Sequence, residues 1–274
     1  MESTNIKYII VPDVHGRKFW KNAMPYINIG VPTIFLGDYS DPYSHEDITP
    51  DMALDNFKEI VDVAINHPNV KLLLGNHDLS YIDGMDVGSN RFCSRLSKDW
   101  KALYNQLFEA HKVGMLEEIE NKGKQIVLSH AGLHPWWLKW VKNKYGFEPQ
   151  HFNQLLYERD SNFAECLRVV GTSRGGYGAA GSMVWADIHD YDTYKINQED
   201  LPVLGGKIQF IGHSQQLEYG YNPKFWWHPG EPRVIWTNDI KVVCLDCHKC
   251  FVLDNNNNLC KLNDMNSVIQ NLNN

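Results

Sequence analysis

The sequence predicts an α/β fold: a two-sheet β-sandwich flanked by helices. Three observations support this fold class. Apolar runs of strand length alternate with amphipathic helical segments in the first part of the chain, a hairpin pattern follows at Met115–Leu128, and short strand-like runs recur from Lys207 onward. With 274 residues and 43% hydrophobic residues, the chain is expected to form a single domain over residues 1–274, ordered from about residue 5 to 262.

The early strands and helices follow each other as β-α-β units, which predicts parallel neighbouring strands. Strands are expected at Ile6–Val11, Pro32–Leu36, Val70–Leu74, Gln125–Leu128, Lys207–Ile211, Arg233–Thr237, Lys241–Leu245 and Cys250–Leu253. Helices are expected at Arg17–Ile27, at Pro50–Ile65 after an N-cap at Thr49, and at Leu96–Phe108, Pro135–Tyr145 and Pro149–Glu158. Hairpins after Lys207 would form the second sheet, and the Asn-rich C-terminus is expected to fray.

Composition excludes several classes of protein. A formal net charge of −7 without a dense basic patch argues against nucleic acid as a partner. The first residues lack the features of a signal peptide, and no apolar run is long enough to span a bilayer. Six cysteines, four of them between Cys244 and Cys260, do not resemble a disulfide framework. We therefore expect a cytoplasmic protein without membrane partners.

Five predicted strands end at carboxylate, amide or imidazole side chains, which is the pattern of a metal site. These residues are Asp13 and His15, Asp38 and Asp41, Asn76 and His77, His130, and His213. Because α/β folds place ligands at the carboxyl ends of their strands, we expect the side chains to meet there. Taken singly, each has an ordinary explanation as a loop residue or a buried imidazole. The ordered set is much harder to obtain by chance.

The donor types suit two divalent transition-metal ions, manganese, iron or zinc, better than magnesium or calcium. Two such ions about 3.5 to 4 Å apart need an anionic bridge, and Asp38 is the natural one. Asp13 and His15 would hold the first ion, and Asn76, His130 and His213 the second. A hydroxide between the ions would attack phosphorus. His77, oriented by Asp41, would then protonate the leaving oxygen as a general acid.

These motifs resemble the calcineurin-like metallophosphoesterases, specifically the phosphoprotein-phosphatase branch of bacterial and phage type. The matching segments are D-x-H-G at 13–16, G-D-x-x-D at 37–41, G-N-H-D at 75–78, H-A-G at 130–132 and G-H at 212–213. The resemblance implies a four-layer β-sandwich between helices, the same two ligand sets, and His77 with Asp41 as the acid pair. The segment Met183–Asp187 is also similar to a segment of the family.

Three departures bear on the substrate. Pro42-Tyr43 follows Asp41 where the family has Arg-Gly, and Leu74 precedes Gly75 where protein phosphatases of the branch commonly have Arg. Two phosphate-binding guanidinium groups are thus missing, and Arg174, in the Gly-rich loop 171–178, is the candidate replacement, the alternative being a solvated loop arginine. The third departure is Asp246-Cys247-His248 in place of Asp-Thr-Gly.

Two further patterns leave alternatives open. Cys244, Cys247 and Cys250 could bind a further metal with His248, or pack as small apolar residues. Phe225–His228 could stack on a nucleobase or form an aromatic sheet edge. For the tryptophans between Trp136 and Trp140, core packing is favoured over ligand stacking.

The predicted function is a phosphoesterase that hydrolyses phosphate monoesters of a small molecule or a phosphoprotein. Cleavage of a nucleotide pyrophosphate, as in diadenosine tetraphosphatase, is the alternative within the class. A catalytically inactive, metal-binding regulatory protein is the alternative from another class. A nucleic-acid phosphodiesterase would need a basic groove that the charge balance does not supply.

Overall fold

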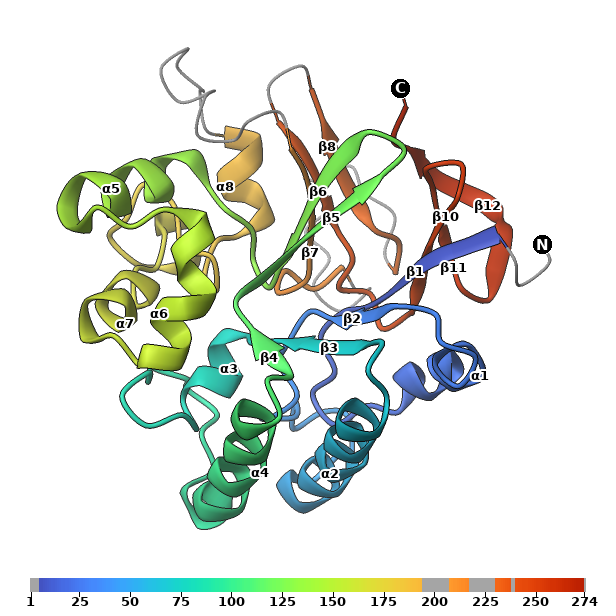
Figure 1. The fold of residues 1–274 in the computed structure, drawn as a ribbon. Coiled ribbons are helices and arrows are strands. Elements are labelled where there is room, and N and C mark those ends of the chain that lie inside the picture. Colours follow the sequence, from blue (N-terminus) through green and yellow to red (C-terminus); the bar gives the residue numbers. More distant parts are fainter. Residues whose placement is uncertain (1–4, 194–206, 217–229, 238–239, 274) are drawn as a thin grey trace. The chain divides into compact units, whose positions relative to one another are not determined.

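The structure is a computed structural model that describes residues 5–193, 207–216, 230–237 and 240–273. The chain divides into two compact units, one formed by residues 1–114 and 248–274 and the other by residues 115–247. Each unit contains one mixed β-sheet and its own helices (Figure 1). The α/β class and the two sheets flanked by helices are confirmed, and the single domain stays a prediction.

The first unit is built on a seven-stranded sheet in the order β12-β11-β10-β1-β2-β3-β4. The parallel strands are β1 (Ile6–Val11), β2 (Thr33–Phe35), β3 (Val70–Leu73) and β4 (Val113–Gly114). The antiparallel strands are β10 (Phe251–Asp254), β11 (Asn258–Lys261) and β12 (Asp264–Asn271). The parallel neighbours β1, β2 and β3 bring their carboxyl ends to one edge, as the β-α-β pattern predicts.

Two long helices of this unit, α2 (Pro50–Asn66) and α4 (Ser97–Glu109), lie side by side (Figure 1). Thr49 caps α2 by accepting a hydrogen bond from Met52 N at 3.2 Å, and Pro50 starts the helix, as predicted. The buried faces of both helices meet in an aromatic cluster in which Phe57 stacks on Trp100 at 5.0 Å. Phe57 also stacks on Tyr39, the residue after Asp38, at 5.0 Å, so the cluster packs against the loop that carries Asp38.

Residues predicted as one helix after Gly16 form a 3₁₀ turn, Phe19–Ala23, and a short helix, α1 (Met24–Ile27). Pro25 lies within the first turn of α1 and has no N–H to donate to an earlier carbonyl, which explains the break. Two more short elements, α3 (Asn76–Leu79) and the 3₁₀ turn Ser94–Leu96, complete the helices described in this unit.

Two expectations for the C-terminal part were wrong. The strand predicted near Cys250–Leu253 joins the first sheet as β10, antiparallel to β1, and not the second. Instead of fraying, the Asn-rich terminus forms β12, which pairs with β11. The pairing of β10 with β1 joins segments that are distant in sequence, which sequence patterns do not reveal. Strand β12 forms a local hairpin with β11, and its polar, Asn-rich composition hides this strand.

The second unit has a five-stranded sheet in the order β5-β6-β7-β9-β8. Its strands are β5 (Leu116–Asn121), β6 (Lys124–Ser129), β7 (Ile208–Ile211), β8 (Arg233–Trp236) and β9 (Lys241–Cys244). The hairpin of β5 and β6 is formed as predicted. Strands β6, β7 and β9 run parallel, so the end of β6 lies beside the end of β7.

The helices of the second unit gather beside its sheet (Figure 1). They are α5 (Pro135–Tyr145), the 3₁₀ turn Pro149–His151, α6 (Phe152–Glu158), α7 (Ser161–Leu167), the 3₁₀ turn Thr172–Arg174 and α8 (Ile188–Thr193). Helix α5 has the predicted bounds and ends at Gly146, whose φ of 72° suits glycine. Trp137 is buried and donates its indole N–H to Cys166 O at 3.0 Å, which confirms core packing for this tryptophan.

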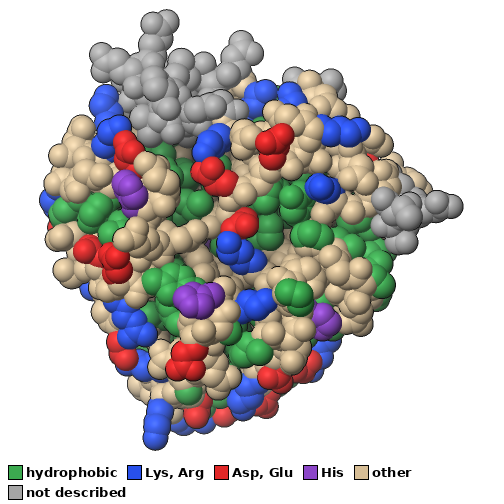
Figure 2. Space-filling model, in the orientation of Figure 1, with side chains coloured by type: hydrophobic (Ala, Val, Ile, Leu, Met, Phe, Trp, Pro, Cys, Tyr) green, Lys and Arg blue, Asp and Glu red, His purple; other side chains and the backbone are tan. Residues whose placement is uncertain are grey.

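Two properties of the described residues agree with the composition. None of the described helices has both the length and the apolar content needed to cross a bilayer. Lysine and arginine side chains are interspersed with aspartate and glutamate on the face shown in Figure 2, so no single basic patch covers it.

Candidate metal centre

In the first unit, the ends of three parallel strands position the predicted residues. Asp13 follows β1, Asp38 follows β2, and Asn76 is the first residue of α3, just after β3. The loops after β1 and β2 are joined by hydrogen bonds from Val14 N and His15 N to Asp38 O, at 3.1 and 2.7 Å. Backbone contacts therefore fix the first two loops against each other.

Tight packing at this edge requires unusual backbone conformations. His15 and Asp38 have φ values of 44° and 52°, in the left-handed region. Gly37 has a φ of 111°, and a Cβ added there would lie 2.5 Å from Gly75 N, so a side chain does not fit. Strain of this kind is characteristic of functional sites.

Three side chains of this edge form a group that could hold a metal ion. The ligand atoms of Asp13, His15 and Asp38 lie within 4.8 Å of one another, and all three side chains are buried. Two carboxylates and an imidazole suit a divalent transition metal. These are the three residues that the sequence analysis assigns to the first ion.

His15 is held in the tautomer that a metal ligand needs. Its Nδ1 lies 2.8 Å from Ser40 O, which can only accept, so Nδ1 carries the proton. Its Nε2 then presents a lone pair and lies 3.4 Å from Asp38 Oδ2. Burial lowers the pKa of His15 to about 4, although Asp38 partly opposes this shift. The imidazole is therefore neutral at pH 7, as metal binding requires.

Asp78 anchors the loops that carry these ligands, a role that the sequence analysis did not assign. Its two carboxylate oxygens accept four hydrogen bonds, from Asp38 N at 2.6 Å, Gly75 N at 2.8 Å, Tyr39 N at 2.9 Å and Tyr104 OH at 2.6 Å. Burial and the charge of Asp38 raise the pKa of Asp78 to about 6, while the donated hydrogen bonds act in the opposite direction. One carboxylate thus ties the β2 loop, the β3 loop and α4 together.

His77 and Asp41 form a hydrogen-bonded pair in the same unit. His77 Nδ1 lies 2.9 Å from Asp41 Oδ2, and His77 N donates to Asp38 Oδ1 at 3.0 Å. Asp41 also accepts hydrogen bonds from Tyr81 OH at 2.6 Å and from Ser89 Oγ at 2.7 Å. Several fixed donors therefore orient the Asp41 carboxylate, which in turn orients the His77 ring.

Ser89, Tyr81 and Arg91 are contacts of this pair that sequence reasoning missed. Ser89 Oγ lies 2.7 Å from His77 Nδ1, and Arg91 Nη2 lies 2.9 Å from His77 Nε2. Ser89 and Arg91 belong to an irregular segment after α3, where no periodicity indicates which side chains point inward. The departure from Arg-Gly after Asp41 is the one signal that could have prompted a search for another arginine.

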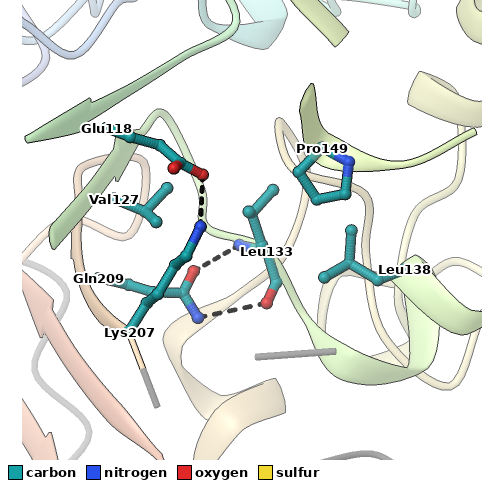
Figure 3. A pocket seen from close by; sticks show the side chains of 7 residues that line it. All are labelled: Glu118, Val127, Leu133, Leu138, Pro149, Lys207 and Gln209. Carbon is teal, nitrogen blue, oxygen red and sulfur yellow. Dashed lines mark hydrogen bonds and ion pairs between the residues drawn. The ribbon is translucent and has the colours of Figure 1, made fainter. Parts of the chain in front are cut away.

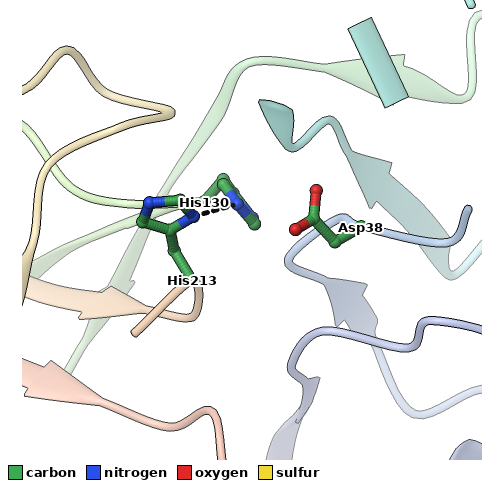
Figure 4. Close-up of side chains that lie close together, drawn as sticks. All are labelled: Asp38, His130 and His213. Atoms are coloured by element: carbon green, nitrogen blue, oxygen red, sulfur yellow. Dashed lines mark hydrogen bonds between the residues drawn. The ribbon is translucent and has the colours of Figure 1, made fainter. Parts of the chain in front are cut away.

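In the second unit, His130 and His213 come together at the ends of β6 and β7. His130 directly follows β6, and His213, with a φ of 64°, lies just after β7. Their rings are hydrogen-bonded between His130 Nε2 and His213 Nδ1 at 3.0 Å (Figure 4). Gly212 N also donates to His130 O at 2.7 Å. The predicted ligands thus fall into two sets, one in each unit.

Arg174 lies beside the backbone of His213. Its Nη2 donates to His213 O and Ser214 Oγ, both at 3.2 Å, and pairs with Asp187 Oδ2 at 3.0 Å. Burial alone would raise the pKa of Asp187, but a hydrogen bond from His189 and the charge of Arg174 lower it to about 2. Arg174 is exposed in its loop, and it bridges Asp187 and the His213 loop.

The remaining sequence patterns have mixed outcomes. Cys244 Sγ donates to Gly212 O and Ser214 O, at 3.3 and 3.2 Å, and burial raises the pKa of Cys250 to about 12. Such a protonated thiol is a poor metal ligand. No group of three metal-ligating atoms found among the described residues includes a cysteine. The segment 225–228 lies outside the residues that the structure describes.

The second unit also has a small cavity that is separate from the candidate metal ligands. It has a volume of about 30 Å³ and is lined by residues that include Leu133, Leu138 and Gln209 (Figure 3). The side-chain amide of Gln209 accepts a hydrogen bond from Leu133 N and donates one to Leu133 O. Lys207 and Glu118, which also line the cavity, form an ion pair. None of the candidate metal ligands or acid residues lines this cavity, so we do not assign the substrate to it.

The fold and the Asp-His group define a metal-dependent phosphoesterase. The sequence model of the calcineurin-like phosphoesterase family matches residues 6–217, which is more than half of the chain. The chain belongs to the calcineurin-like phosphoesterase family. No curated protein matches the sequence. The predicted family is thereby confirmed, while the phosphoprotein-phosphatase branch and the bacterial or phage type stay predictions.

Proposed function

We propose that this chain hydrolyses phosphate monoesters with two divalent transition-metal ions, manganese, iron or zinc. One ion would be held by Asp13, His15 and Asp38. The other would be held by Asp38, Asn76, His130 and His213. The observation that carries the proposal is the buried group of Asp13, His15 and Asp38 next to the hydrogen-bonded pair of His77 and Asp41.

The donor set supports this proposal on chemical grounds. A pair of buried carboxylates would be costly without a cation to neutralise them, because burial penalises charge. His15 is neutral and turns its Nε2 lone pair toward Asp38. In the second unit, His130 and His213 add imidazole nitrogens, which also suit transition metals. The residues therefore fit the ions that the family uses.

When bound, the two ions would supply an activated water and neutralise charge on the phosphate. The chain's own residues would deliver the proton. Asp41 would keep the His77 ring oriented through Nδ1. Arg91 Nη2, which can only donate, contacts Nε2 in this structure, so His77 would act as the acid once Nε2 is protonated and Arg91 has turned to the phosphate. Ser89 and Tyr81 would fix the Asp41 carboxylate during this transfer.

The contacts of Arg174 support a positioning role, because its Nη2 bonds to the carbonyl of His213 and to Asp187. Its phosphate-binding role stays a prediction. The same holds for the two alternative functions, nucleotide pyrophosphate cleavage and an inactive regulatory protein.

A substrate panel tests the proposal. Purified protein with Mn²⁺ should turn over p-nitrophenyl phosphate faster than its bis ester, diadenosine tetraphosphate or a phosphopeptide. Faster cleavage of diadenosine tetraphosphate would favour the pyrophosphatase, and faster cleavage of the phosphopeptide would identify a protein phosphatase. If none of the four is cleaved in a metal-dependent way, the hydrolase proposal is wrong and the regulatory alternative gains support.

A further inference from the structure

We propose that Arg91 binds the non-bridging oxygens of the substrate phosphate and thereby favours monoesters over diesters. This inference rests on the proposed hydrolytic function. It addresses the missing guanidinium groups that the sequence pattern leaves unexplained.

Arg91 lies beside the proposed general acid. Arg91 Nη2 lies 2.9 Å from His77 Nε2, the atom proposed to protonate the leaving oxygen. The His77 ring in turn makes an edge contact with the His15 ring, with centroids 5.2 Å apart. A guanidinium in this position lies within reach of a phosphate whose leaving oxygen faces His77.

An aromatic ring holds the Arg91 guanidinium in this position. Its Cζ lies 3.7 Å from the centroid of the Tyr43 ring, so the charged plane is stacked on an aromatic face. Tyr43 also makes an edge contact with the His15 ring, at 5.0 Å. Tyr43 stands where the resembling family has the glycine of Arg-Gly. The Pro42-Tyr43 segment, which lacks the expected arginine, therefore supplies the aromatic ring on which Arg91 stacks.

Two arginines approach the Tyr43 ring, and only one of them is paired with a carboxylate among the described residues. Arg17 also approaches this ring, at 5.4 Å, but Glu46 neutralises it through two hydrogen bonds of 2.7 Å. Arg91 makes no ion pair with a carboxylate among the residues that the structure describes. Of the two arginines, Arg91 is the one whose charge is left for an anion.

The Arg91 guanidinium also carries an unsatisfied donor. Arg91 Nη1 is buried and has no hydrogen-bond partner within the described part of the chain. A buried N–H group without a partner is costly, and for a charged group the cost is larger. A guanidinium presents two parallel N–H groups that match two phosphate oxygens. A phosphate dianion would satisfy Nη1 and compensate the charge at once.

A contact between Arg91 and the substrate phosphate predicts a preference for monoesters. A monoester dianion has more charge on its free oxygens than a diester monoanion, so it gains more from a fixed cation. Loss of one charge-assisted contact corresponds to a decrease of roughly 10- to 100-fold in kcat/KM. Arg91→Ala should therefore reduce kcat/KM for p-nitrophenyl phosphate by this factor, and that for bis(p-nitrophenyl) phosphate much less.

The experiment compares Arg91→Ala and Arg91→Lys with a matched control, Arg95→Ala. Arg95 lies four residues further on, is exposed, and pairs with the exposed Asp51. The lysine variant keeps the charge without the paired donors, so it should recover part of the monoester activity. It also serves as the second variant if the alanine variant does not fold. The Arg95 control should behave like the wild type.

A second readout does not depend on turnover. Binding of inorganic phosphate to the manganese-loaded protein, measured by calorimetry, should be roughly 10-fold or more weaker in Arg91→Ala at equal manganese content. Equal losses for both esters with unchanged phosphate affinity would overturn the inference, because Arg91 would then only hold His77. If the wild type cleaves neither ester, the proposed function fails. Weaker phosphate binding in the variant would still support the contact with Arg91.

Discussion

Removal of the Tyr104 hydroxyl tests how Asp78 holds the candidate site. Tyr104 is buried, and its hydroxyl donates to Asp78 Oδ1 at 2.6 Å. A hydrogen bond to a charged acceptor contributes about 1.5 to 3 kcal/mol to stability. In Tyr104→Phe the carboxylate keeps its three backbone donors, so no donor is left unpaired. We therefore expect a loss of about 2 kcal/mol in the free energy of unfolding.

Tyr39→Phe is the matched control for this prediction. Tyr39 is equally buried, but its hydroxyl donates to a neutral acceptor, Leu73 O, at 2.9 Å. A neutral hydrogen bond contributes about 1 kcal/mol, so this variant should lose about half as much stability. Urea unfolding followed by circular dichroism measures both losses. Equal losses, or a larger loss in Tyr39→Phe, would show that Asp78 does not anchor the loops as a charged acceptor.

Three further predictions concern the proton donor, an ion pair and the metals. His77→Asn should keep its bound metals but lose roughly 100-fold or more in kcat for p-nitrophenyl phosphate, as expected when a general acid is removed; unchanged turnover would refute the acid role. For Asp187, a folded-state pKa of about 2, below its ordinary value of 3.8, means that its stabilising contribution is present above pH 4 and is lost as the pH falls toward 2. Asp187→Asn should thus lose about 2 kcal/mol of stability relative to the wild type at pH 7 and clearly less at pH 3 in urea unfolding, and a pH-independent difference would contradict this. Chelation of the ions should lower the melting temperature, since a ligand at 100 times its Kd stabilises a protein by about 2.7 kcal/mol; an unchanged melting temperature after verified metal removal would argue against buried metal sites.

The strand ends that carry Asp13, Asp38 and Asn76 could be predicted from the sequence. Each follows an apolar run of strand length, and the β-α-β order requires parallel neighbours whose carboxyl ends share one edge. Helix α2 could be predicted for a similar reason, because the cap at Thr49 and Pro50 is a local signal. Such features are encoded within a few neighbouring residues.

Features that depend on distant contacts could not be predicted. The anchoring role of Asp78 requires knowing that Tyr104 and the β2 loop reach it. Arg91 meets Tyr43 and His77 from an irregular segment, where neither a helical nor a strand period indicates the direction of a side chain. The place of β10 in the first sheet depends on pairing with β1, about 240 residues earlier in the chain.

The number of metal ions bound per chain tests the proposed dinuclear site most directly. Elemental analysis of protein dialysed after manganese loading should give two ions per chain for the wild type. Asp38→Asn, which removes the proposed bridging carboxylate, should bind one ion or none. Asp62→Asn, an exposed substitution on α2, should bind two. Two ions in Asp38→Asn, or fewer than two in the wild type, would contradict the proposed dinuclear site.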